Sequence, residues 1–129
     1  MWPIFKYLAG LDLAKAGMIA TFSVMLGAGL QPIFGIFSDR GAQRSLILWG
    51  VGMASMGVLL GPISLLNGYM SEGAWYLLML GVMVFVCVGQ GMYHPSATSA
   101  AGNLAGHRRS TLVSLFIAAG MFGFSISQG

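Results

Sequence analysis

Long apolar runs separated by short polar gaps make up most of this chain. Four of these runs cover residues 16–38, 45–66, 75–104 and 110–129. Each is long enough to cross a hydrocarbon layer of about 30 Å, which takes roughly 20 mostly apolar residues in a helix. The pattern therefore predicts an all-α integral membrane protein with four membrane-spanning helices.

The third run is longer than a membrane crossing requires. Its apolar part ends at Tyr93, and small residues continue the helical pattern from Ala97 to Leu104, with no strong turn before Gly106. Pro95 lies inside this helix and removes one backbone hydrogen bond, so we expect a kink there.

Charged residues interrupt the beginning of the chain. Lys6, Asp12 and Lys15 break the apolar pattern, so this segment is too polar for a complete span. Residues 1–7 are instead expected to form the end of a preceding helix, followed by a loop.

The composition indicates what surrounds these helices. Hydrophobic residues make up 57% of the sequence and charged residues 7%, with a mean hydropathy of +0.82. Soluble domains carry about 25% charged residues, so the expected partner of this surface is a lipid bilayer. The net charge of +3 is small and the arginines adjoin apolar runs, which argues against nucleic-acid binding. The single cysteine, Cys87, excludes an intramolecular disulfide.

Basic residues fall in alternate gaps between the apolar runs. Arg40 and Arg44 lie in the first gap, Arg108 and Arg109 lie in the third, and residues 67–74 contain no basic residue. Basic loops of membrane proteins face the cytoplasm. This rule places both arginine pairs in the cytoplasm and the middle gap outside, although two lysines near the N-terminus oppose the assignment.

The first gap contains a motif of a glycine, an aspartate and two arginines, at positions Gly35, Asp39, Arg40 and Arg44. This motif resembles the signature loop between helices 2 and 3 of the major facilitator superfamily of transporters. Gly41 stands one position early, and Gln43 replaces a basic residue of the family pattern. The resemblance implies that the Asp39 carboxylate stabilises one conformation of a transporter, for example at a helix N-terminus. The alternative is an ordinary cytoplasmic loop.

A second set of residues resembles the fosmidomycin-resistance branch of the same superfamily. It consists of Gly91, the pair His94-Pro95, a basic loop with Arg108 and Arg109, and a following helix with Ser114, Phe116, Gly120 and Gly123. The resemblance implies a partial N-terminal half of six helices: the end of helix 1, helices 2–4 and most of helix 5. Ser127 and Gln128 depart from the Gly-Pro that is common in helix 5 of this branch.

The resemblance also implies a function. A transporter of this kind moves a small solute or drug across the cell membrane by alternating access, with efflux as the expected direction. Protons are a candidate coupling ion, the bacterial inner membrane is the expected location, and the remainder of the transporter is an expected partner. Two alternatives stay open: a complete small four-span protein that acts as an oligomer, and a non-transporting membrane subunit.

Four polar side chains are candidates for lining a solute cavity: Gln31, Gln90, His94 and Thr98. The last three share one helical face with Cys87, and ionisable groups inside membranes are often functional. The alternative for His94 is a neutral imidazole that is hydrogen-bonded to a facing helix. Gln31 lies on a stripe with Gly35 and Ser38, which helix packing explains equally well.

Glycines indicate where helices approach one another. Gly57 and Gly61 form a small-xxx-small pair, which predicts a helix contact. The family resemblance, with its glycine-spaced helix 5, implies that Gly120 and Gly123 are packing positions too.

The sequence contains no pattern typical of an enzyme. A serine–histidine–acid set, a glycine-rich phosphate loop and metal-ligand spacing are all absent. We therefore expect a non-enzyme without catalytic residues, metal or cofactor.

Overall fold

The structure is a computed structural model that describes residues 12–127. Throughout this range the chain forms helices joined by tight turns, and no strand occurs in it. The all-α prediction is therefore confirmed. The predicted helix end at residues 1–7 lies outside the described range, as do the last two residues of the fourth predicted span.

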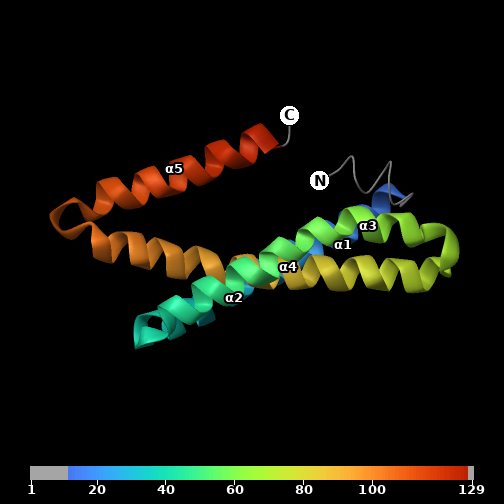
Figure 1. Cartoon of the computed structure of the whole chain (residues 1–129), viewed down its shortest axis with the longest axis horizontal. Helices are drawn as coiled ribbons and strands as arrows, with labels where there is room; N and C mark the ends of the chain where they lie inside the picture. Colours follow the sequence, from blue (N-terminus) through green and yellow to red (C-terminus); the bar gives the residue numbers. More distant parts are fainter. Residues whose placement is uncertain (1–11, 128–129) are drawn as a thin grey trace.

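Four long helical arms follow one another along the chain (Figure 1). Their elements are α1 (Leu13–Phe37), η2 (Ser38–Ala42), α2 (Gln43–Ser55), η3 (Met56–Leu59), α3 (Leu60–Ser64), η4 (Leu65–Tyr69), α4 (Glu72–Leu104), η5 (Gly106–Arg108) and α5 (Arg109–Ser127). The segment from α2 to η4 forms the second arm. Helix α4 continues through Pro95.

Polar caps start α1 and α4 at the same end of the molecule. Asp12 accepts a hydrogen bond from the backbone N–H of Leu13 at 2.8 Å, and the hydroxyl of Ser71 accepts one from the N–H of Ala74 at 3.4 Å. Such caps satisfy backbone donors that a first helical turn leaves free. An ion pair between Lys15 and Glu72 joins the two helix starts.

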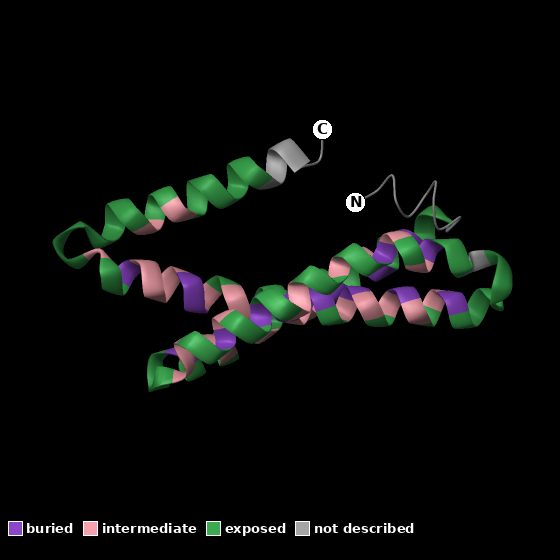
Figure 2. Cartoon of the chain, in the orientation of Figure 1, coloured by how far each residue is buried: buried purple, intermediate pink, exposed green. Residues whose placement is uncertain are grey.

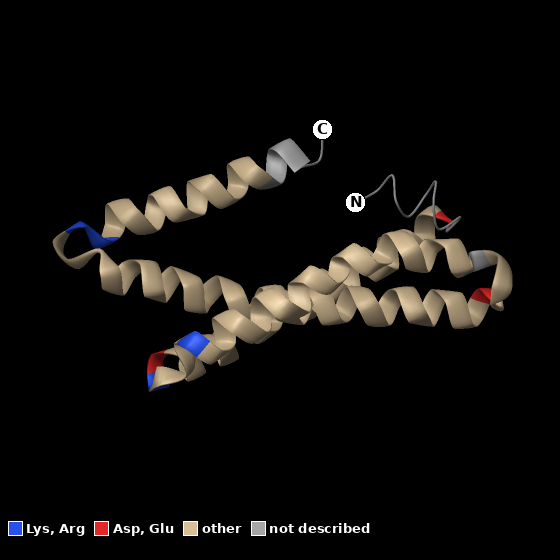
Figure 3. Ribbon diagram, viewed as in Figure 1, with Lys and Arg blue, Asp and Glu red and all other residues tan. Residues whose placement is uncertain are grey.

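Glycines close the turns at the opposite end, which we call the arginine end. Gly41 has φ = 97° between α1 and α2, and Gly106 has φ = 51° between α4 and α5. Glycine adopts positive φ without the steric penalty of a side chain. Both turns carry arginines, and charged residues lie at the helix ends while the helix bodies between them are uncharged (Figure 3).

Helix α4 is the central helix, with α1 and α2 packed along it. A Cβ atom at Gly27 would lie 2.7 Å from the carbonyl oxygen of Cys87, and one at Gly50 would lie 2.8 Å from that of Gly89. Gly89 and Gly91 are about 200° apart around the helix. The two glycines therefore admit α2 and α1, respectively, on different faces of α4.

The four glycines that were predicted to be packing positions make no such close contact with a neighbouring helix. A Cβ atom at Gly57 would make ordinary contact with Val86, 3.6 Å from Cγ2, whereas a Cβ atom at Gly61, Gly120 or Gly123 would meet nothing within 4 Å. The closest helix contacts thus fall on glycines that the sequence pattern did not identify as packing positions. Spacing within one helix does not reveal which of its faces another helix approaches.

A small apolar core joins the starts of α1 and α4 to α3. Its buried members are Ala16, Ile19, Leu60, Trp75, Met79 and Met83. Trp75 is 1% exposed and is the largest of the fully buried side chains. This core holds the three arms together at the end opposite the arginines.

Most other large apolar side chains face outward (Figure 2). Met25 and Trp49 are each 69% exposed and Phe122 is 70% exposed. Two helical stretches of the described chain, Leu13–Ser64 and Glu72–Leu104, are long and apolar enough to cross a membrane. In the most apolar 18 residues of each stretch, only 17% and 39% of the residues, respectively, are buried. The core helix of a soluble protein is mostly buried, unlike these two stretches.

Candidate functional site

A polar pocket of about 470 Å³ lies at the arginine end between α1, α4 and the start of α5. The first helix and its turn contribute Gln31, Gly35, Ser38 and Asp39. Helix α4 contributes His94, Pro95, Thr98 and Ser99, and α5 contributes Arg109 and Val113. Its volume is within the range of about 300–1,000 Å³ that is typical of small-molecule sites.

Helical periodicity explains why these residues meet. Gly27, Gln31, Gly35 and Ser38 follow one another at intervals of three or four residues along α1, which places them on one face. This face touches α4 at Gly91, where a Cβ atom would lie 2.7 Å from the carbonyl oxygen of Gly27. Beyond that contact the same faces line the pocket. The α1–α2 pair and the α4–α5 pair diverge toward the arginine end in Figure 1.

The pocket brings together residues from both groups of predicted sites. Gln31, His94 and Thr98 were predicted to line a cavity, and they line this one. Gly35 and Asp39 of the signature loop are also in its wall. The carboxylate of the loop and the polar side chains of α4 therefore share one space.

Three predicted site residues lie outside this wall. Gln90 is exposed on α4 and does not line the pocket, because it is turned about 100° from Gly91, which faces α1. Arg40 and Arg44 are exposed at the turn and also do not contribute to the wall. Of the signature loop, only the glycine and the carboxylate thus face the pocket.

The His94 side chain is exposed toward the pocket rather than tied to another helix. Within the described part of the chain it forms no hydrogen bond, so the alternative of a histidine that joins two helices is not observed. Its backbone carbonyl accepts a hydrogen bond from Thr98 Oγ1 at 2.8 Å. Its ring makes an edge contact with Tyr93, with centroids 5.7 Å apart.

Ser38 has an unpaired hydroxyl in the pocket wall. The residue is 5% exposed, and its Oγ atom has no hydrogen-bond partner. The buried hydroxyls of Ser23 and Ser96 are in the same state and line none of the three pockets, so the unpaired state by itself does not indicate a ligand. Sequence analysis placed Ser38 on the same small and polar stripe as Gln31 and Gly35, seven residues from Gln31, but did not name it as a cavity residue.

Arg109 enters the pocket wall from the first turn of α5. Its side chain lies over Gly102 of α4, where a Cβ atom would be 2.9 Å from Nε and 3.4 Å from Cγ. Sequence analysis assigned Arg109 to topology and to the basic loop of the family resemblance, and not to a cavity wall. No local signal distinguishes it from Arg108, since only the fold turns one of the two toward α1.

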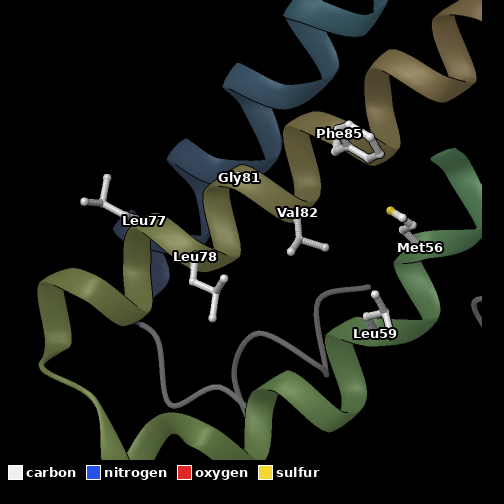
Figure 4. A pocket seen from close by; sticks show the side chains of 7 residues that line it. All are labelled: Met56, Leu59, Leu77, Leu78, Gly81, Val82 and Phe85. Atoms are coloured by element: carbon white, nitrogen blue, oxygen red, sulfur yellow. The ribbon is translucent and has the colours of Figure 1, made fainter.

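The other described pockets have a different chemistry. One of about 370 Å³ is lined by Gly81 and apolar side chains from the second arm and α4, among them Met56, Leu77 and Phe85 (Figure 4). Another, of about 410 Å³, lies between α1 and α4, where Met18, Phe22 and Leu80 contribute to its wall. Neither of these two pockets has a charged residue in its wall, in contrast to the pocket at the arginine end.

Comparison with known proteins identifies no relative: no family model, curated protein or solved structure matches this chain. Among residues 12–127, no group of three or more His, Cys, Asp and Glu side chains could hold a metal ion. The pocket wall contains hydroxyl, amide, imidazole, carboxylate and guanidinium groups.

Proposed function

We propose that this chain is a multi-pass protein of the cell membrane, with the bacterial inner membrane as its location. Exposed apolar side chains along the helix bodies support this proposal, because such a surface is unfavourable in water. The charge distribution also supports it. The arginines lie at one end, and the Lys15–Glu72 ion pair lies at the other, as expected for helices whose ends reach water on both sides.

Within that membrane, the proposed function is secondary active transport of a small solute or drug by alternating access, with efflux as the direction. These helices would be part of the N-terminal half of a major-facilitator-type transporter of the fosmidomycin-resistance-like branch. The observation that carries this proposal is the polar pocket, which joins Asp39 of the signature loop to His94 and Thr98 on the facing helix. Polar groups inside an otherwise apolar bundle typically mark solute or ion pathways.

The pocket also supports a role for the remainder of such a transporter. Its described wall comes from α1, η2, α4 and α5, and α5 is mostly exposed where its side chains are described (Figure 2). In transporters built from two halves, solute binds between the halves and the halves rock around it. The second half would close this pocket from its open side.

A single-cysteine experiment tests alternating access. The chain has one cysteine, Cys87, which is buried, so Cys87→Ser gives a background for Thr98→Cys. The reagent is a membrane-impermeant methanethiosulfonate, applied to intact cells and to inside-out vesicles. A transporter should expose position 98 to water on both sides in turn.

The control is Met25→Cys in the same background, on an outward-facing apolar part of α1. A thiol in hydrocarbon does not ionise and should react from neither side. Reaction of position 98 from the cytoplasmic side alone would contradict alternating access and favour a non-transporting membrane subunit.

A further inference from the structure

We infer that the arginine end binds the headgroups of anionic phospholipids in the membrane leaflet that it faces. This inference goes beyond the proposed transport activity and rests only on the proposed membrane location. It is carried by an excess of exposed arginines at this end and by exposed leucines that lie beside two of them.

The two ends of the molecule differ in charge (Figure 3). The arginine end combines four arginines with one acid, Asp39. Among the described residues, the opposite end combines Lys15 with two acids, Asp12 and Glu72. Basic residues close to a membrane surface attract anionic lipids, and each one strengthens the attraction. Only the arginine end therefore favours anionic lipids over neutral ones.

Three of the arginines are available to a lipid headgroup. Arg40, Arg44 and Arg108 are exposed and lie outside the wall of the polar pocket. Within residues 12–127, none of the three forms an ion pair or a side-chain hydrogen bond. A guanidinium group pairs readily with phosphate oxygens. These side chains can thus contact lipid phosphates without involving the pocket.

Exposed leucines lie beside two of these arginines. Leu48 follows Arg44 by four residues in α2 and is 64% exposed. Leu112 follows Arg108 by four residues at the start of α5 and is 43% exposed. Residues four apart are neighbours on a helix surface. A phospholipid fits this arrangement, since its phosphate reaches the arginine while an acyl chain covers the leucine. A free phosphate ion would use the arginine alone.

Binding of this kind does not require a fixed distance between the two arginine-bearing turns. Separate lipid molecules can contact each turn, and the attraction depends on charge near the membrane surface. Lysine should therefore replace arginine with little loss. A site built around one phosphate would instead depend on the planar fork of the guanidinium group.

Spin-labelled lipids measure the expected preference. Phosphatidylglycerol and phosphatidylcholine with the same labelled acyl chain are added separately to the whole chain in phosphatidylcholine nanodiscs. Lipid that contacts the protein is motionally restricted, and its electron paramagnetic resonance signal gives the association of each lipid with the protein. At low salt we expect phosphatidylglycerol to associate about two- to fivefold more strongly. The preference should disappear at about 1 M salt, where the Debye length is about 3 Å.

Two triple variants and one control assign the preference to the arginines. Replacing Arg40, Arg44 and Arg108 together by glutamine should remove it, whereas replacing them together by lysine should retain it. Lys15→Gln is the control, because it removes a cation at the opposite end that is already paired with Glu72. It should leave the preference nearly unchanged. Nanodiscs expose both faces of the bilayer, so a variant that inserts in the opposite direction gives the same readout.

Equal association of the two lipids with the unaltered protein at low salt would overturn the inference. A preference that persists in the glutamine variant, or that is lost in the lysine variant, would also overturn it. Inorganic phosphate provides a further comparison with chloride at equal ionic strength. If phosphate alone removed the preference, the arginines would bind a free anion rather than a lipid.

Failure of the proposed membrane location gives a different result from failure of this inference. Without that location, neither labelled lipid would show a motionally restricted signal. A restricted signal of equal size for both headgroups would contradict the lipid preference alone.

Discussion

The carbonyl oxygen of Gly27 lies 2.7 Å from the position that a Cβ atom would take at Gly91. At this point α1 and α4 approach so closely that no side chain fits between their backbones. The next residues along the two faces, Gln31 and His94, line the polar pocket. The glycine contact therefore defines the closed end of that pocket.

Gly91→Ala should destabilise the protein, because its Cβ atom would meet backbone rather than a flexible side chain. We expect a loss of about 1–3 kcal/mol, typical of overpacking in a tight interface. The measurement is unfolding of the detergent-solubilised protein, monitored by circular dichroism.

Gly61→Ala is the matched control for that variant. A Cβ atom at Gly61 meets nothing within 4 Å, and alanine favours a helix over glycine by about 1 kcal/mol. This variant should be as stable as the original or slightly more so. Equal destabilisation by both alanines would show that α1 and α4 do not touch at Gly91.

The charge pattern predicts the orientation of the chain in a membrane. Cysteines in place of Ala42 and His107, introduced into the Cys87→Ser background, should react with an impermeant maleimide only from the cytoplasm, and one in place of Met70 only from outside. Ala42 is preferable to Gly41, whose φ of 97° disfavours a side chain. Labelling of position 70 from the cytoplasmic side would contradict both the orientation and the proposed family.

Asp39→Asn should lower the rate of transport while membrane insertion stays intact. A carboxylate near a helix N-terminus contributes roughly 0.3–2 kcal/mol, so the rate should fall by a factor of about two to thirty. The measurement is solute flux in vesicles, normalised to the amount of inserted protein.

Glu72→Gln is the control for that charge change, because Glu72 is an exposed acid at the opposite end of the helices. Exposed ion pairs contribute little, so the rate should be nearly unchanged. An unaltered maximal rate for Asp39→Asn would show that the motif determines only the orientation of the chain in the membrane and has no role in transport.

His94→Ala should alter solute affinity or the pH dependence of transport rather than stability. The imidazole is exposed in the pocket and forms no hydrogen bond within the described part of the chain. Its removal should therefore change the free energy of unfolding by about 0.5 kcal/mol or less. A pH profile of binding and a thermal scan on one preparation measure both effects.

Gln90→Ala provides the comparison on the same helix. Gln90 is exposed and lies outside the pocket wall, so its replacement should leave affinity and pH profile unchanged. A large loss of stability in His94→Ala with an unchanged pH profile would instead assign the histidine a structural role.

Several features of this molecule follow from local sequence. The lengths of the apolar runs predict helices over the ranges where they occur, because each backbone must satisfy its own hydrogen bonds wherever water is scarce. Asp12 and Ser71 cap helices that begin next to them. His94 and Thr98 were identifiable as members of one polar face of α4, since helical periodicity alone places residues of one helix on a common face.

The tertiary structure decided which of those faces meet. The close contacts between helices lie at Gly27, Gly50, Gly89 and Gly91. Open space surrounds the position of a Cβ atom at Gly61, Gly120 and Gly123. Arg109 and Ser38 joined the pocket and Gln90 did not. The physical reason is that a contact needs matching surfaces on two helices at once. The sequence of one helix determines which of its residues share a face. Which helix packs against that face, and where the two helices cross, depends on where their backbones approach closely enough to exclude a side chain. The same approach determines how much space is left for a pocket beside the contact.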